Sequence, residues 1–334
     1  MRKILLSFAL LSLAASPAAA ARSSDAIIRV LNTKTAGSPA AYAKAVAVVA
    51  EDAKEGRILQ QFLIALLSRE KDAPAEARIS EETRARYLAN SRDRIFEMAR
   101  TRNNAMAWYL ISLEKNDMTI LKHAADLGNV QALNTYATIK MSEAIESAEI
   151  SPAESEAAMK ECFDSYVRAA KEKNANALNS LGMCYQKGYG CRKDDSRAFK
   201  CFFKAAEMRH PEAVNNLGRF YLEGVGVEKD PARALKCFEI SSSLGNVWGT
   251  VNYATAVMMG QGCKKDSARA IGILERSAAG GAVEAMDFLS ECYSKGIADI
   301  RKDPYKAMLW RLRARAARGD ASAREWLKVN KAEL

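Results

Sequence analysis

Two Ser-x-x-Lys pairs, Ser68 with Lys71 and Ser112 with Lys115, are the residues whose spacing comes closest to a catalytic motif. In penicillin-recognising enzymes such a serine is the nucleophile, but those enzymes also need Ser-Asp-Asn and Lys-Thr-Gly, and neither occurs in this sequence. Cys-x-x-Cys, His-Glu-x-x-His, Gly-x-Ser-x-Gly and phosphate-loop patterns are also missing from the sequence. We therefore expect a non-enzymatic protein with no catalytic residue, no metal site and no cofactor.

The sequence contains only two histidines, His123 and His210. Both fall near the ends of expected helices, where a capping or surface role is favoured over catalysis. Two imidazoles in 334 residues also leave little room for a histidine-based metal site.

Seven cysteines, an odd number, are spread over the C-terminal two thirds of the chain: Cys162, Cys184, Cys191, Cys201, Cys237, Cys263 and Cys292. Cys162 and Cys184 are each 11 residues from an expected turn at Lys173, so they would come level in an antiparallel hairpin. We predict a disulfide between these two, provided that their Cβ vectors converge. For Cys201 and Cys237 we expect the role of small buried apolar residues.

The first 21 residues have the pattern of a signal peptide. Arg2 and Lys3 precede an apolar run from Ile4 to Ala15, and Pro17 leads into a run of four alanines. A run of this length is too short to span a bilayer as a helix, which takes about 20 residues. We therefore predict cleavage after Ala20 or Ala21, periplasmic or secreted localisation, and no membrane span.

Composition favours helix throughout. The chain has 49% hydrophobic but only 7% aromatic residues, much of the former alanine, and only 7 prolines. An all-β fold is excluded on this basis, and disorder is disfavoured.

The net charge of +10 becomes +8 once Arg2 and Lys3 are removed with the signal peptide. Part of the excess lies near the C-terminus, at Arg311, Arg313, Arg315, Arg318 and Arg324. This segment either binds an anionic polymer, such as a cell-wall polymer, or, as we favour, is a solvated helix face. Nucleic acid is not an expected partner.

A repeat of 36 residues organises the chain from Ala177 onward. Gly188 recurs at Gly224, Gly260 and Gly296, and Lys193-Asp194 recurs at Lys229-Asp230, Lys265-Asp266 and, after one inserted residue, Lys302-Asp303. Each unit is predicted to be helix, loop, helix: the glycines end the first helix, and the aspartates cap the second. Such a hairpin cannot bury its apolar face alone, so a fixed period predicts a stacked array.

The pattern Leu-Gly-x-x-Tyr-x-x-Gly-x-Gly-x-x-Lys-Asp resembles the Sel-one-like (Sel1-like) repeat family, a relative of the tetratricopeptide repeat. The resemblance implies an all-α fold, a right-handed α/α superhelical solenoid of about 36-residue helix–loop–helix repeats, that presents a surface to a protein partner. The third unit departs from the pattern with Tyr253-Ala254 and Val257, and the fourth with Ser290 and Ala298. The disulfide of the family's cysteine-rich branch is not expected, because its positions hold Ala206 and Ala213.

Four regions are predicted after the signal peptide. Residues 22–120 form an N-terminal helical region, with helices over 39–56, 58–67 and 80–103. A degenerate repeat with an insertion from Ser142 to Ser155 occupies 121–174, and Ser151 to Glu154 is predicted to be a capping box that starts a helix. Four repeats span 175–320, and a C-terminal capping helix spans 321–334.

One arc of the third repeat is our predicted partner contact. On a helical wheel the positions opposite the shared core face are mostly polar in the second repeat, whereas in the third they are largely apolar. The predicted contact residues are Trp248, Val251, Thr255, Met258, Met259 and Phe288. The predicted function is an exported binding or scaffold protein; the alternatives are an anionic-polymer binder and a β-lactam or cell-wall hydrolase.

Overall fold

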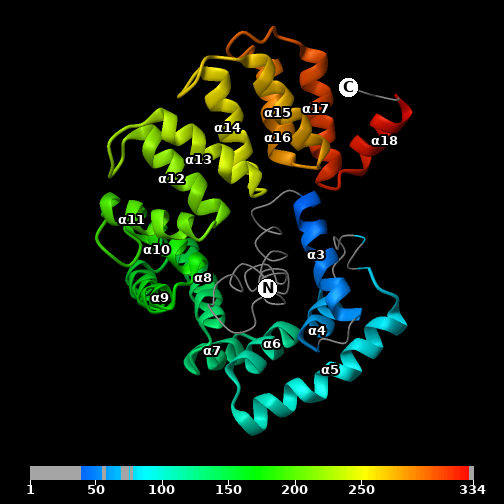
Figure 1. Ribbon diagram of the computed structural model, residues 1–334, viewed down its shortest axis with the longest axis vertical. Helices are drawn as coiled ribbons and strands as arrows, with labels where there is room; N and C mark the ends of the chain where they lie inside the picture. The colour runs from blue at the N-terminus through cyan, green and yellow to red at the C-terminus, as the bar shows by residue number, and fades with distance from the viewer. Residues whose placement is uncertain (1–38, 55–57, 69–74, 76–77, 331–334) are drawn as a thin grey trace. The chain divides into compact units, whose positions relative to one another are not determined.

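The computed structural model describes residues 39–54, 58–68, 75 and 78–330, and every regular element among them is a helix (Figure 1). The chain divides into two compact units, one holding Ala41–His210 and the other Pro211–Leu334. The predicted signal peptide falls outside the described residues.

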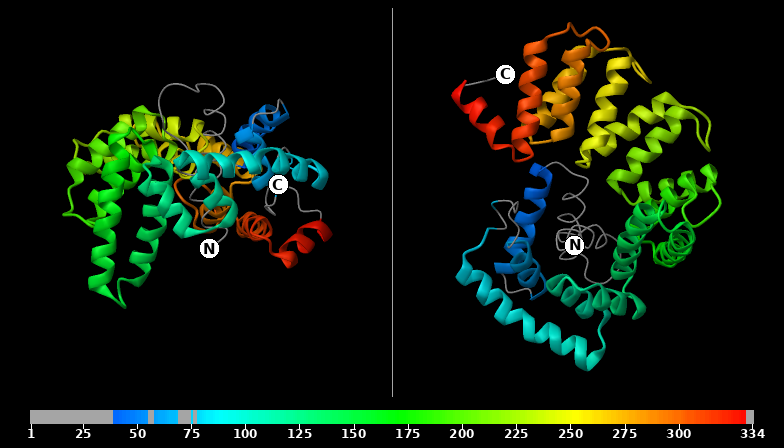
Figure 2. Two further views of the ribbon diagram at one scale, coloured as in Figure 1. Left: turned by 90° about the horizontal axis from the view of Figure 1, so that it is seen from below. Right: turned by 180° about the vertical axis from the view of Figure 1, so that it is seen from behind.

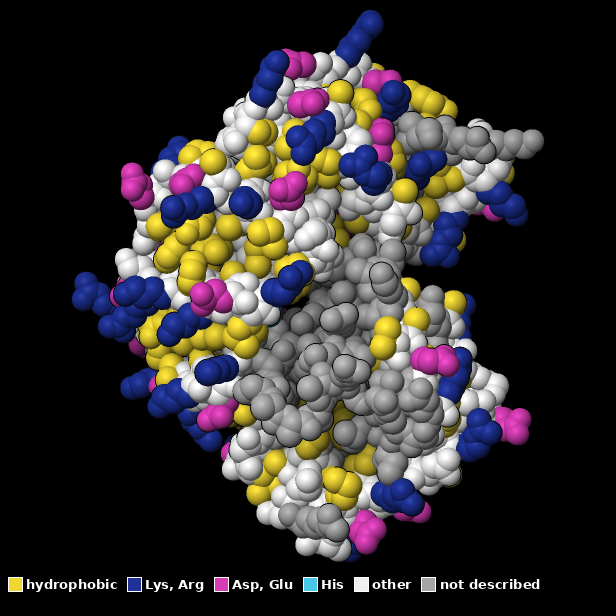
Figure 3. All heavy atoms as spheres, viewed as in Figure 1, with side chains coloured by type: hydrophobic (Ala, Val, Ile, Leu, Met, Phe, Trp, Pro, Cys, Tyr) yellow, Lys and Arg dark blue, Asp and Glu magenta, His cyan; other side chains and the backbone are white. Residues whose placement is uncertain are grey.

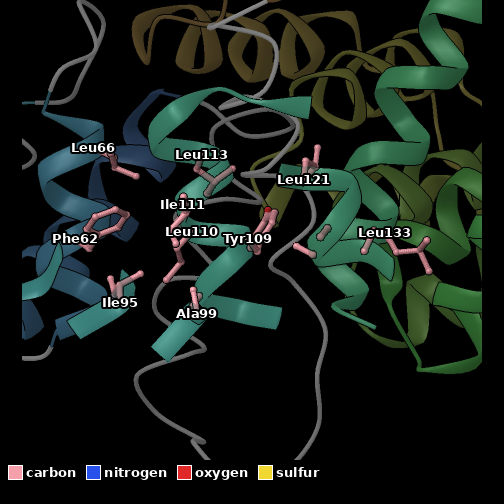
Figure 4. Close-up of a cluster of buried hydrophobic side chains, with 14 of the residues drawn as sticks. Phe62, Leu66, Ile95, Ala99, Tyr109, Leu110, Ile111, Leu113, Leu121 and Leu133 are labelled. Carbon is pink, nitrogen blue, oxygen red and sulfur yellow. The ribbon is translucent and has the colours of Figure 1, made fainter. Parts of the chain in front are cut away.

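The larger unit contains nine described helices. They are α3 (Pro39–Lys54), α4 (Ile58–Leu67), α5 (Glu81–Arg102), α6 (Ala105–Lys115), α7 (Met118–Asp126), α8 (Val130–Ser147), α9 (Pro152–Lys171), α10 (Ala175–Lys187) and α11 (Asp195–Glu207). The predicted 58–67 helix matches α4 residue for residue, and α5 lies within the predicted 80–103 helix, with Ser80 as its N-cap. A core of side chains from α4 to α8 includes Phe62, Ile95 and Tyr109 (Figure 4).

The smaller unit contains seven described helices. They are α12 (Pro211–Glu223), α13 (Pro231–Ser243), α14 (Val247–Met259), α15 (Ser267–Ala279), α16 (Val283–Lys295), α17 (Pro304–Ala317) and α18 (Ala321–Val329). Within each unit consecutive helices from α4 onward pack against each other, and α14 also contacts the first helices of the neighbouring repeats, α12 and α16. This is the stacking of a helical solenoid, which confirms the predicted fold class.

The helix caps explain why the hairpins recur. Each loop aspartate accepts a hydrogen bond from the backbone amide three residues later at 2.9 Å; these aspartates are Asp194, Asp230, Asp266 and Asp303. Gly188, Gly260 and Gly296 end the first helices in the left-handed region, with φ between 71° and 80°. The same short signal therefore stops one helix and starts the next in each unit.

The insertion lengthens a hairpin and adds no separate element. The α8 and α9 helices have 18 and 20 residues, against 13 in α10 and α11. Seen from below in Figure 2, this green hairpin extends past its neighbours in the unit. The predicted capping box is wrong: Ser151 makes no side-chain cap bond, because its backbone (φ −132°, ψ 72°) does not direct its hydroxyl toward the free amides.

Candidate binding surfaces

A narrow stripe along α14 carries exposed apolar side chains. Trp248 is 59% exposed and Met259 is 45% exposed. At 100° per residue, 11 residues bring the two within about 20° of each other around the helix. Asn252 and Thr255 lie between them on the same side and are half-buried. From Gly249 to Met258 the other residues of α14 are buried, so this stripe is the accessible part of the helix.

The structure corrects the predicted contact arc in two places. Val251 and Met258 are buried and cannot meet a partner, and Phe288 is half-buried. The helical wheel assigned the whole outer arc to solvent. In the solenoid, however, α14 touches α12 and α16 on its flanks as well as α13 and α15. Those flanking helices cover the edges of the arc and leave its centre exposed.

Other repeats hold polar residues where α14 is apolar. At the position of Met259 they have Lys187, Glu223 and Lys295. At the position of Trp248 they have Asn176, Glu212 and Glu284. The third repeat therefore departs from the rest at its most accessible positions, where solvent alone favours polar residues.

A groove of about 390 Å³ lies between α7, α8 and α9 in the larger unit. Its apolar lining includes Ala125, Leu133 and Tyr136. The charged lining residues are Lys122, Asp126, Lys160, Glu161, Asp164 and Arg168. Sequence reasoning missed this groove, because its lining residues lie on three separate helices and no local motif marks them.

Of the two Ser-x-x-Lys pairs, the structure describes both members only for Ser112 and Lys115, and these two do not form a nucleophile–base arrangement. Ser112 is buried and donates its hydroxyl hydrogen to the Tyr109 carbonyl at 2.6 Å, while Lys115 on the same helix is exposed. Ser68 donates to the Ala65 carbonyl at 3.0 Å, and Lys71 lies outside the described residues. Ser112 is therefore not activated by Lys115 in this geometry.

The histidines have different surroundings. His123 is exposed near the end of α7 and makes an edge contact with Trp108 at 5.2 Å between ring centroids. His210 is buried, and its Nε2 lies 2.7 Å from Asn176 Oδ1. Burial lowers the pKa of His210 to about 4, so the ring is neutral at physiological pH.

All seven cysteines are free thiols in the structure. Cys162 and Cys184 are buried in one cluster with Tyr166 and Leu181, and Cys191 and Cys201 are packed against its edge. The disulfide between Cys162 and Cys184 stays a prediction, which thiol mapping of the oxidised protein tests. Burial raises the pKa of Cys162 to about 12 and that of Cys201 to about 11, so neither is a reactive thiolate at neutral pH.

Several arginines near the C-terminus are engaged by neighbours. Arg315 pairs with Asp320 at 2.6 Å, Arg318 pairs with Asp287, and the Arg313 guanidinium lies 5.2 Å from the Trp310 ring centroid. On the face drawn in Figure 3, basic and acidic side chains are interspersed with hydrophobic patches. The charge of this segment is therefore partly neutralised locally, which fits a solvated helix face better than a polymer-binding site.

In the part of the chain that the structure describes, no group of three or more His, Cys, Asp or Glu side chains is arranged to hold a metal ion. None of the described helices is both long enough and apolar enough to cross a membrane.

Comparison with known families decides what kind of array this is. Residues 175–210, 211–246, 251–281 and 283–317 each match the Sel1 repeat. The chain carries four Sel1 repeats. The resemblance predicted from the sequence is thereby confirmed, and Sel1 repeats are typically scaffolds for protein–protein interaction.

Two solved structures are similar to this chain. A Sel1 repeat protein from Oxalobacter formigenes aligns with a TM-score of 0.50 and 26% identity, over 66% of this chain and 84% of that one. A protective antigen of uropathogenic Escherichia coli with an SLR fold aligns with a TM-score of 0.50 and 20% identity, over 84% of this chain and 58% of that one. The second likeness concerns the fold alone. Comparison with curated proteins gives no match.

Proposed function

We propose that this protein is an exported, non-enzymatic scaffold of the cell envelope, and that the exposed stripe of α14 holds an apolar segment of a protein partner. The observation that carries the proposal is the exposure of Trp248 and Met259 together on a helix that is otherwise almost entirely buried. Export is supported by the signal-peptide pattern of residues 1–21.

The stripe has the chemistry of a recognition surface. Tryptophan contributes a large rigid surface and is enriched among residues that dominate binding energy, while methionine adapts its shape to a partner. Eleven residues of α-helix separate the two side chains by roughly 16 Å along the axis, about three helical turns. A short amphipathic helix of the partner, with apolar residues at its first and third turns, fits this spacing.

The double variant Trp248→Ala with Met259→Ala tests the stripe. The matched control is Tyr305→Ala with Met308→Ala, which removes an aromatic and a methionine of comparable exposure from α17. We expect the α14 variant to lose the partner that the wild type and the control retain in pull-downs from the native envelope. Its melting temperature should stay close to that of the wild type, because both side chains are exposed.

Two results would contradict this proposal. Retained capture by the α14 variant would remove the stripe as the contact surface. Loss of several kcal/mol of stability would instead identify the stripe as part of an internal contact. A separate measurement checks export: N-terminal sequencing of the protein from a periplasmic or secreted fraction should begin after Ala20 or Ala21.

A further inference from the structure

We propose that Cys191 and Cys184 are a thiol pair that a disulfide oxidant converts into a disulfide, which joins the loop of the first repeat to the end of α10. The proposal rests on the contact between the two residues, on their different exposure and on a comparison with the same loop in the other repeats. Because Cys184 can form only one disulfide, this pairing is an alternative to the bond with Cys162 predicted from the sequence.

The two cysteines meet where the loop of the first repeat folds back over the end of α10. Cys184 lies in the last turn of this helix, and Cys191 lies in the loop that follows it. The Cys191 thiol donates a hydrogen bond to the Cys184 carbonyl oxygen, with 3.6 Å between sulfur and oxygen. Cys184 belongs to a buried apolar cluster, and Cys191 is packed against the same cluster. The two residues are therefore adjacent before any oxidation.

The two thiols differ in their access to solvent. Cys184 is 2% exposed, whereas Cys191 is half-buried at the edge of the cluster. Burial raises the pKa of both thiols, and at Cys191 the positive charge of Arg197 opposes this rise. Because the attacking species is an accessible thiolate, Cys191 is the thiol that meets the oxidant. Cys184 is then the resolving thiol, which displaces the oxidant from Cys191.

The reaction consists of two thiol–disulfide exchanges. In the first, the Cys191 thiolate attacks oxidised glutathione, whose S–S bond breaks to release one glutathione and leave the other bonded to Cys191. In the second, Cys184 loses its proton and attacks the Cys191 sulfur, and the second glutathione leaves. The two protein thiols give up two electrons and two protons, which reduce the oxidant to two thiols. Exported proteins meet oxidants of this class in their compartment.

The other repeats lack one or both members of this pair. At the position of Cys184 they have Phe220, Ala256 and Cys292. Three residues after the loop glycine, at the position of Cys191, they have Val227, Cys263 and Asp299. The loop of the third repeat is therefore an internal control, because Cys263 is half-buried like Cys191 but has an alanine where the resolving thiol would be.

The location of the pair gives the bond a structural consequence. Gly190, the neighbour of Cys191, approaches α9 so closely that a Cβ on it would overlap the backbone of Met159. The loop therefore forms part of the contact between the first repeat and the hairpin before it. A disulfide to Cys184 fixes this loop on α10 and restricts the unfolded chain.

Peptide mapping of the purified protein tests the pairing. The reduced protein is incubated with oxidised glutathione at mildly alkaline pH, the remaining thiols are alkylated, and trypsin digests the chain without reduction. Trypsin cuts after Lys187, so the expected bond links peptide 174–187 to peptide 188–192. Cys263 has no resolving thiol at the equivalent position and should stop at the mixed disulfide with glutathione.

Two variants identify the resolving thiol. Cys184→Ala should convert Cys191 into a stable glutathione adduct, which is the product expected at Cys263 in the wild type. The matched control is Cys201→Ala, which removes another cysteine packed against the same cluster and should leave the bond between Cys184 and Cys191 unchanged. Since the wild-type map needs no substitution, the test does not depend on the folding of either variant.

The proposal is overturned if Cys184 of the wild type is recovered alkylated or bonded to Cys201, or if Cys191 retains glutathione. A bond between Cys184 and Cys162 would also overturn it and would confirm the pairing predicted from the sequence. The map is made on the purified protein and does not involve Trp248 or Met259. Failure of this proposal therefore leaves the proposed role of the α14 stripe untouched, and the converse also holds.

Discussion

The second glycine of each repeat loop shows how a single residue joins two neighbouring hairpins. Gly190 and Gly262 have φ of 66° and 81°, and a Cβ at either would overlap the backbone of an earlier helix, at Met159 and Pro231 respectively. The fourth repeat has Ala298 at this position, exposed and still left-handed, with φ of 55°. That alanine adopts a conformation which costs a residue with a Cβ about 1–2 kcal/mol.

Replacing Ala298 with glycine should therefore stabilise the protein. Glycine removes the free-energy cost of the left-handed conformation, and this gain is larger than the free energy lost because the unfolded chain becomes more flexible. We therefore expect the free energy of unfolding to rise by about 0.5 kcal/mol. Urea denaturation measures it. The opposite change in the third repeat, Gly262→Ala, should cost about 2 kcal/mol or more, and a neutral result there would contradict the packing role of the glycine.

His210 occupies the position that Asn174 and Asn246 fill in neighbouring repeats. Its pKa is about 4 in the folded protein, against an ordinary value of 6.5. Below pH 6.5 the unfolded chain takes up a proton that the folded protein excludes, so stability falls as the pH drops toward 4. This difference in pKa corresponds to a loss of at most about 3 kcal/mol in the free energy of unfolding.

The variant His210→Asn should remove this part of the pH dependence. Between pH 7 and pH 4.5 we expect the wild type to lose about 2 kcal/mol more stability than the variant does, as measured by urea denaturation at both values. Equal losses in the two proteins would show that His210 is protonated without opening its surroundings.

At the scale of helices, the two members of a hairpin approach closely where the first one has a glycine. A Cβ on Gly182 would lie 2.7 Å from the ring of Phe202, and a Cβ on Gly218 would lie 2.6 Å from Phe238. Both rings are fully buried. The small residue therefore allows the aromatic ring to fill the space between the two helices.

The substitution Gly182→Ala should destabilise the larger unit by about 2 kcal/mol, because the buried ring cannot move aside without strain. Gly272→Ala is the matched control: Gly272 also lies within a helix, but its nearest neighbour is the flexible Arg276 guanidinium at 3.6 Å. There the higher helix propensity of alanine should stabilise by about 0.5–1 kcal/mol. Thermal or urea unfolding of both variants gives the comparison.

The sequence predicted those features that repeat, because a cap or a stop needs only a few residues in fixed order. The aspartate caps, the glycine stops, α4 and α5 follow from such local signals. The burial of Val251 and Met258 does not follow from local signals, because it depends on contacts with helices two elements away along the chain. The contact made by Tyr253 does not follow from the local sequence either. Val257 stands where the other repeats have a tyrosine, and the Arg269 guanidinium lies instead over the ring of Tyr253, one helical turn earlier, at 5.8 Å from the ring centroid.

At the scale of the whole array, an end repeat has one face that no further repeat covers. The α18 helix packs on α17 at this end, with Ala323 buried and Arg324 Nε donating to the Ala316 carbonyl at 3.0 Å. Solenoids need such a terminal element to keep the last interface from solvent.

Ending the chain at Asp320 should therefore lower the free energy of unfolding by about 2 kcal/mol and increase the tendency to associate. Urea denaturation and light scattering report the two effects. A chain that ends at Asn330 retains α18 and serves as the control, and should behave as the wild type. Equal stability of both truncated chains would contradict the capping role.

One phenol in the third repeat connects two successive repeats. The Tyr253 hydroxyl donates to Glu239 on α13 at 3.0 Å and accepts from Arg269 on α15 at 2.6 Å. The stability of a linear array divides into a contribution from each repeat and a coupling between nearest neighbours. The two hydrogen bonds of the Tyr253 hydroxyl strengthen the coupling between the second and third repeats. If the array is unfolded by a force applied at its C-terminal end, unfolding should therefore stop temporarily at the interface between the second and third repeats, where three side chains provide the mechanical resistance.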